Sequence, residues 1–126
     1  VPDALPALIR SYKIQKKAAE VGFDWKDVRD AFSKIKEETS ELLEIYQSGE
    51  ATRIKEEVGD LLFAVVNVAR FLGVNPEEAL NLTSSKFIDR FAFIEESASV
   101  HGKRLEEMSL EEMDKLWEKA KLKQNL

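Results

Sequence analysis

The chain has 126 residues, the length of one ordinary domain, and no cysteine, so it can form neither a disulfide nor a cysteine-ligated metal site. Its 44% hydrophobic and 34% charged residues suffice for a core and a solvated surface, which excludes intrinsic disorder. A net charge of −5 argues against a general nucleic-acid binder, and a lone histidine, His101, excludes sites that need two imidazoles.

Apolar residues recur at helical spacing along the chain, and no segment alternates long enough to predict a strand. We predict helices over residues 5–20, from Asp24 to about Gln47, over 51–72 and 75–100, and a short one after Ser109. Asp24, Asn75 and Ser109 are the expected N-caps. The sequence therefore predicts an all-α helical bundle, four main helices plus a short C-terminal helix, forming one domain over residues 1–126.

The third predicted helix is apolar nearly all round from Leu61 to Leu72. Such a helix lies at the centre of a bundle or in a subunit interface, so we expect a homodimer. The apolar run from Leu61 to Ala69 is too short to span a bilayer. The first residues form no secretory signal, so we expect a cytosolic protein and no membrane partner.

Acidic residues gather on the two helices that flank Gly49. Glu38 and Asp60 lie eleven residues on either side of this glycine, and Glu41 and Glu57 lie eight residues on either side. If the helices fold back antiparallel about Gly49, the four carboxylates form a square. Residues three apart share a helix face, so each pair can point into the shared seam.

Four neighbouring carboxylates repel one another, by on the order of 1 to 4 kcal/mol per pair at ~4 Å. A bound Mg²⁺ or Mn²⁺ would compensate, because hard cations prefer oxygen ligands. A solvated acidic face, with Lys34 and Arg53 paired along the helices, remains the alternative interpretation. Lys86 and Arg90 lie four residues apart on the fourth helix and could bind the oxygens of a polyphosphate. Alternatively, they are two solvent-exposed basic side chains.

Two tryptophans and one asparagine are further candidates for contacts with a ligand. Either tryptophan could stack on a base. Trp117 could instead pack in the core, and Trp25 could instead brace the start of the second helix. Asn67 could bind a ligand or form an interhelical hydrogen bond.

The motif Glu37-Glu38-x-x-Glu41, followed by Glu57-x-x-Asp60, resembles the signature of MazG-type nucleoside triphosphate pyrophosphohydrolases. The resemblance is greatest to the C-terminal domain of the two-domain bacterial proteins. It extends over nearly the whole chain, through Gly22-Phe23-Asp24-Trp25, Gly59 to Ala64, Asn67 to Arg70, Lys86-Phe87-x-x-Arg90-Phe91 and Trp117.

This resemblance implies Mg²⁺-dependent hydrolysis of nucleoside triphosphates at the α-phosphorus, with broad base specificity, in a bundle built from two chains. Glu38 or Glu41 would be the catalytic base. The residues that match metal-binding positions are Glu38, Glu41, Glu57 and Asp60. The residues that match or flank substrate-contacting positions are Lys34, Glu37, Arg53, Lys86, Arg90 and Trp117.

Two other classes compete with this hydrolase. A di-iron or di-manganese carboxylate bundle would carry Glu-x-x-His motifs, which this chain lacks. A non-catalytic helical dimerisation or regulatory module could keep the acidic face without turnover.

Overall fold

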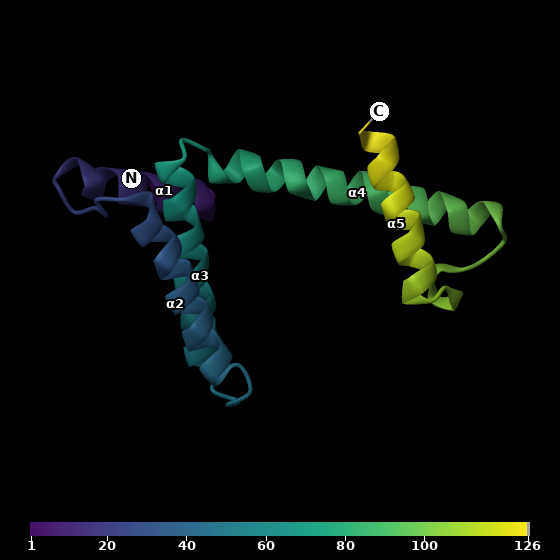
Figure 1. The fold of residues 1–126 in the computed structure, drawn as a ribbon, viewed down its shortest axis with the longest axis horizontal. Coiled ribbons are helices and arrows are strands. Elements are labelled where there is room, and N and C mark those ends of the chain that lie inside the picture. Colours follow the sequence, from purple (N-terminus) through teal and green to yellow (C-terminus); the bar gives the residue numbers. More distant parts are fainter. Residues whose placement is uncertain (126) are drawn as a thin grey trace. The chain divides into compact units, whose positions relative to one another are not determined.

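A computed structural model describes residues 1–125, and all regular structure in this range is helical. Figure 1 shows the five α-helices in chain order, so the predicted all-α class is confirmed. The chain divides into two compact units, Val1–Ala79 and Leu80–Leu126. No helix within residues 1–125 combines the length and the apolar character that a bilayer crossing requires.

Helix α1 (Ala7–Glu20) follows a proline, which fixes the backbone for a helix start but offers no capping side chain. The cap comes from far along the chain. Glu77 Oε1 accepts hydrogen bonds from the backbone N–H groups of Leu8, at 3.0 Å, and Ile9, at 3.3 Å. A carboxylate at this end also suits the helix dipole. Gly22, with φ +95°, ends the turn that follows the helix.

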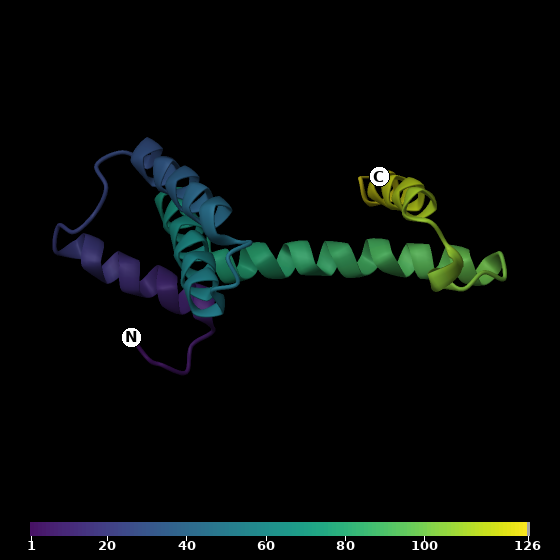
Figure 2. The ribbon, with the colours of Figure 1, turned by 90° about the horizontal axis from the view of Figure 1, so that it is seen from below.

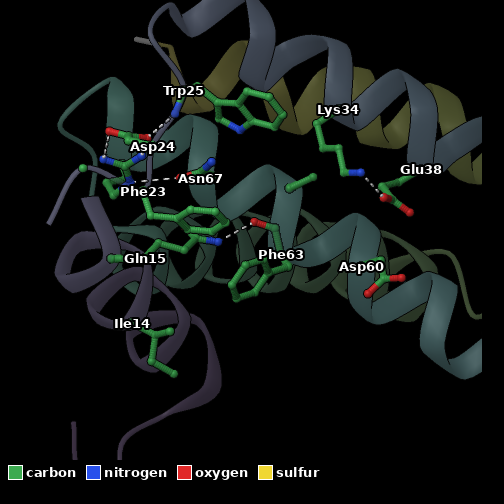
Figure 3. Close-up of a pocket in the computed structure, with 14 residues that line it drawn as sticks. Ile14, Gln15, Phe23, Asp24, Trp25, Lys34, Glu38, Asp60, Phe63 and Asn67 are labelled. Carbon is green, nitrogen blue, oxygen red and sulfur yellow. Dashed lines mark hydrogen bonds and ion pairs between the residues drawn. The ribbon is translucent and has the colours of Figure 1, made fainter. Parts of the chain in front are cut away.

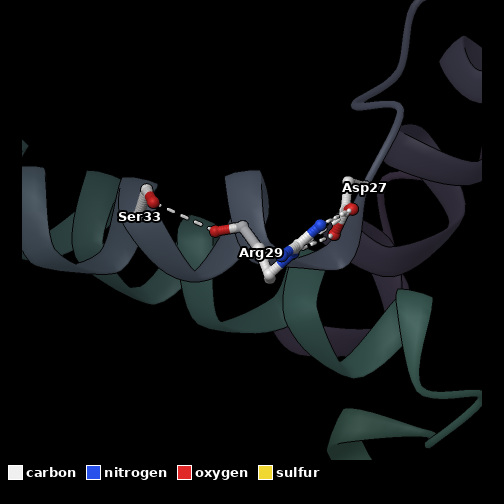
Figure 4. A network of polar contacts seen from close by, with 3 residues as sticks. All are labelled: Asp27, Arg29 and Ser33. Atoms are coloured by element: carbon white, nitrogen blue, oxygen red, sulfur yellow. Dashed lines mark hydrogen bonds and ion pairs between the residues drawn. The ribbon is translucent and has the colours of Figure 1, made fainter.

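Helix α2 (Val28–Ile45) starts later than the sequence predicts. Its N-cap is Asp27, whose side chain accepts a hydrogen bond from the backbone N–H of Arg29 at 2.8 Å (Figure 4). The expectation that Asp24 caps this helix is therefore wrong. Asp24 instead pairs with the guanidinium of Arg70, and a charged partner offers a carboxylate a stronger hydrogen bond than a neutral N–H does.

Helix α3 (Ala51–Phe71) packs against both α1 and α2, and it runs beside α2 in Figures 1 and 2. Its buried side chains are Ala64, Val66 and Val68. This helix is expected to lie at the centre of a bundle or in a subunit interface, and in the single chain it is only partly buried. Four apolar side chains on one face form what we call the α3 stripe. They are 40–59% exposed in the single chain: Val58, Leu62, Val65 and Leu72.

The remaining elements are α4 (Pro76–Val100), a 3₁₀ turn (Leu105–Glu107) and α5 (Leu110–Gln124). The predicted caps are confirmed here. Asn75 Oδ1 accepts from the backbone N–H groups of residues 77 and 78, and Ser109 Oγ accepts from that of residue 112. In the second unit, Phe87 packs against Phe91 and Trp117.

Candidate active site

The acidic residues are positioned by the tight turn between α2 and α3. Gly49 adopts φ +78°, a left-handed conformation that favours glycine, and so lets α3 fold back along α2. Oxygen atoms of Glu38, Glu57 and Asp60 then lie within 4.8 Å of one another. Those of Glu37, Glu38 and Glu41 form a second group within the same distance. The register about Gly49 thus brings Glu38 beside Glu57 and Asp60. Glu41 lies in the other group, so the acids of the predicted square are found in two clusters that share Glu38.

Two of these carboxylates each have one buried oxygen without a partner among the described residues. Glu38 is only 5% exposed, and its Oε2 has no hydrogen-bond partner within residues 1–125. Glu57 Oε2 is buried and unpartnered in the same part of the chain. An unsatisfied buried polar atom costs about 1–3 kcal/mol, and more when it is charged. Clustered carboxylate oxygens without donors fit a hard divalent cation.

One lysine offsets part of the negative charge. Lys34 Nζ lies 3.1 Å from Glu38 Oε1 and 3.4 Å from Glu37 Oε2, and Figure 3 shows it directed toward Glu38 from the same helix. The hydrogen bond to Glu38 raises the pKa of Lys34 above its usual value. Lys34 therefore stays charged at neutral pH, yet it reaches only one oxygen of Glu38.

Glu41 carries the clearest sign of crowding among the acids. Hydrogen bonds to Glu57 and Glu38, together with the charge of Glu38, raise the pKa of Glu41 to about 7. Without a cation, one proton is therefore shared within this group near neutral pH.

Replacing Glu41 by Gln is expected to stabilise the metal-free protein at high pH. The pKa of Glu41 is about 7 in the folded chain against 4.5 for an ordinary Glu. The wild type is thus unaffected below pH 4.5, where both states are protonated, and loses stability as pH rises toward 7. Gln can donate to Glu57 at every pH. In EDTA at pH 8 the variant should melt roughly 2–6 °C higher, with no difference at pH 4. A melting temperature at pH 8 that is lower for the variant than for the wild type would contradict repulsion between Glu41 and its neighbouring carboxylates.

A cavity of about 680 Å³ opens beside the acids, within the first unit. Figure 3 shows Lys34, Glu38 and Asp60 toward one end, and Gln15 and Asn67 further along. Asn67 and Trp25 both line this cavity. Asn67 Oδ1 accepts from Arg70 Nε at 2.9 Å, within the same helix.

Gln15 is the cavity residue that sequence reasoning missed. It lies on the inner face of α1 and donates from Nε2 to the carbonyl oxygen of Phe63 at 2.9 Å. A signal was present, because Gln15 falls seven residues after Leu8 and three after Tyr12, on the apolar stripe of this helix.

The other predicted substrate residues are divided between the two units. Arg53, near the start of α3, pairs with Glu50 at 3.6 Å. Lys86, Arg90 and Trp117 belong to the second unit. There the Arg90 guanidinium lies 5.3 Å from the centre of the Trp117 ring, so these two residues are brought together. Lys86 is exposed.

Known proteins resemble this chain over the region that contains the acidic residues. A family model described as the MazG nucleotide pyrophosphohydrolase domain matches residues 26–92, a range that contains all four acids of the square. A Thermotoga maritima protein named nucleoside triphosphate pyrophosphohydrolase/pyrophosphatase MazG is 47% identical over 117 residues, 93% of this chain and 45% of that protein. An Escherichia coli protein named nucleoside triphosphate pyrophosphohydrolase is 40% identical over 125 residues, 96% of this chain and 47% of that protein. The chain thus spans about half the length of these curated relatives.

Proposed function

The chain belongs to the MazG nucleotide pyrophosphohydrolase family, and on that premise we propose that it hydrolyses nucleoside triphosphates to nucleoside monophosphate and pyrophosphate. The observation that carries the proposal is the pair of acidic clusters that share Glu38, beside a cavity. One buried oxygen of Glu38 and one of Glu57 have no partner within residues 1–125. A solvated acidic face would not bury these oxygens without partners.

The square would hold Mg²⁺, or Mn²⁺ in its place, through Glu38, Glu41, Glu57 and Asp60. When bound, such an ion neutralises phosphate charge and makes a coordinated water more acidic. Either Glu38 or Glu41 accepts the proton of the attacking water. The water oxygen bonds to the α-phosphorus, the bond from that phosphorus to the bridging oxygen breaks, and pyrophosphate leaves. No covalent intermediate with the protein is needed.

The basic residues would act on the phosphate chain. Lys34, already held between Glu37 and Glu38, would contact phosphate at the edge of the square. Arg53, Lys86 and Arg90 are proposed as further phosphate contacts, and Trp117 and Glu37 as further nucleotide contacts, by their match to the family's positions. Broad base specificity and a cytosolic setting belong to the same proposal.

The protein would act as a homodimer. The α3 stripe leaves Val58, Leu62, Val65 and Leu72 half-exposed along one helix face. A contiguous apolar face of this kind is typical of a subunit interface. A second copy of the chain is the partner that the family resemblance implies, and each site could be completed across the interface.

Pyrophosphate release from a panel of ribo- and deoxyribonucleoside triphosphates tests the proposal. We expect turnover of several bases with Mg²⁺ or Mn²⁺, loss of turnover in EDTA, and one pyrophosphate released per monophosphate formed. Release of single phosphates would contradict attack at the α-phosphorus. No turnover of any nucleotide, combined with binding of Mg²⁺, would favour the alternative of a non-catalytic module.

A further inference from the structure

One ion pair joins the loop after α1 to the C-terminal part of α3. The loop spans residues 21–27, between α1 and α2. Arg70 donates from Nη1 to Asp24 Oδ2 at 3.2 Å and from Nη2 to Asp24 Oδ1. A guanidinium and a carboxylate that share two hydrogen bonds hold a defined relative orientation. The partners come from Gly22-Phe23-Asp24-Trp25 and from Asn67 to Arg70, two sequence motifs that the proposed hydrolysis does not use.

Both side chains of this pair are tied to further atoms. Arg70 Nε donates to Asn67 Oδ1 at 2.9 Å, so each nitrogen of the guanidinium has a partner. On the loop, Asp24 Oδ1 also accepts from the backbone N–H of Trp25 at 2.8 Å (Figure 3). The Arg70 side chain is only 12% exposed and that of Asp24 26%, so the pair is mostly shielded from water and its hydrogen bonds are stronger than exposed ones. Asp24 therefore connects α3 directly to the peptide that carries Trp25.

The loop that this pair holds forms one wall of the cavity. Four of its residues line the space of about 680 Å³: Gly22, Phe23, Asp24 and Trp25. Phe23 is 83% exposed and Trp25 43%, so burial of their rings contributes little to holding the loop in place. Among the described residues, the bonds from Arg70 are the only side-chain hydrogen bonds that link the loop to α3. The position of this wall therefore depends on Asp24 and Arg70.

Resting on the proposed function, we propose that Arg70 is a positioning residue for this reaction. It acts through Asp24 to hold residues 21–27 in place as a wall of the substrate cavity. The acids that would do the chemistry lie on the hairpin about Gly49, and Asp60 precedes Arg70 on α3 by about 15 Å along the helix axis. Loss of the pair therefore weakens substrate binding without changing the chemical step, so it raises KM and leaves kcat almost unchanged.

Two substitutions remove the pair, one from each side. Arg70→Met keeps a long unbranched side chain without the charge, and Asp24→Asn keeps the shape of the side chain without the charge. Each is expected to raise KM for a hydrolysed nucleoside triphosphate about tenfold and to change kcat by less than about twofold. The double variant should raise KM by no more than the larger single effect, because the same interaction is lost in all three. Asp3→Asn breaks another aspartate–arginine pair, outside the cavity, and is the matched control that should keep the wild-type KM.

Melting temperatures separate positioning from a purely structural role. Asp24→Asn leaves the mostly buried charge of Arg70 without an anionic partner, so this variant should melt at a lower temperature than the wild type. The double variant removes that charge as well, and should therefore melt at a higher temperature than Asp24→Asn while its KM stays raised. If the pair only stabilised the fold, KM would recover together with the melting temperature.

The position of the loop can also be followed without nucleotide or turnover. The chain has two tryptophans, so Trp117→Phe leaves Trp25 as the only indole fluorophore. In this background, adding Arg70→Met should raise the acrylamide quenching constant of Trp25 and shift its emission to the red, because a loop without its ion pair opens to solvent more often. Adding Asp3→Asn should do neither. Circular dichroism checks that the helices remain in every variant.

The two kinds of measurement keep this role of Arg70 distinguishable from hydrolysis itself. Unchanged Trp25 quenching in the Arg70→Met variant would overturn the role of Arg70 while hydrolysis stands. A fall in kcat at constant KM, or single effects on KM that multiply in the double variant, would overturn it in the same way. If the wild type turns over no nucleotide, the proposed hydrolysis fails, and raised Trp25 quenching in Arg70→Met would still support the hold of this residue on the loop.

Discussion

Exchange of Asp60 for Asn is expected to lower kcat/KM for any nucleoside triphosphate by about three orders of magnitude, with the helices intact. Asp60 shares the oxygen cluster with Glu38 and Glu57, each of which has one buried oxygen without a partner in the described part of the chain. An amide keeps the shape of the side chain but replaces one anionic oxygen by an N–H donor, which repels a cation. Glu41→Gln should lower activity by a similar factor.

The same two substitutions should not harm folding, which separates this loss from a structural one. Asp60 is exposed, and the change of charge relieves repulsion among the acids. Asp30→Asn, an exposed change in the first turn of α2, is the matched control and should keep wild-type activity. Stopped-time pyrophosphate assays with circular dichroism melts give both readings. Turnover near the wild-type rate by Asp60→Asn and Glu41→Gln would refute the assignment of the acidic square.

The helices could be predicted from the sequence where their signals are local. Asn75 and Ser109 stand directly before apolar periodic segments, and both cap as expected. Asp24 is also a good capping residue, but its carboxylate is taken by Arg70, 46 residues further on. Whether Asp24 or Asp27 caps α2 therefore depends on Arg70, and local sequence patterns carry no information about such a distant partner.

The candidate site also has one part that local sequence signals predict and one part that depends on distant packing. The acidic residues lie on one helical hairpin, so the equal spacing from Gly49 is enough to predict that Glu38 and Asp60 are neighbours, as the structure shows. The cavity depends on how α1 packs on α3, and this packing places Gln15 against the backbone of Phe63. Only the coordinates reveal that the amide nitrogen donates to Phe63 and that the amide oxygen is left without a partner within residues 1–125.

Replacing Val65 by Glu is expected to convert the proposed homodimer into a monomer. Val65 lies centrally in the α3 stripe and is 47% exposed in the single chain, so a lone chain can hold a solvated carboxylate there. In a dimer built on this stripe, the new charge would be buried without a partner, at a cost of several kcal/mol. The dissociation constant should therefore rise at least about a hundredfold, and sedimentation velocity at micromolar concentration should show a single monomeric species.

Thr52→Glu adds the same charge to an exposed position of α3 outside the stripe, in the first turn, where an acid is favourable. This control should remain dimeric with an unchanged melting temperature. If the site is completed across the interface, Val65→Glu also loses nucleotide turnover, and turnover recovers as protein concentration is raised toward the new dissociation constant. A wild type that sediments as a monomer, or a Val65→Glu variant that stays dimeric, would show that the α3 stripe is not the surface that joins two copies.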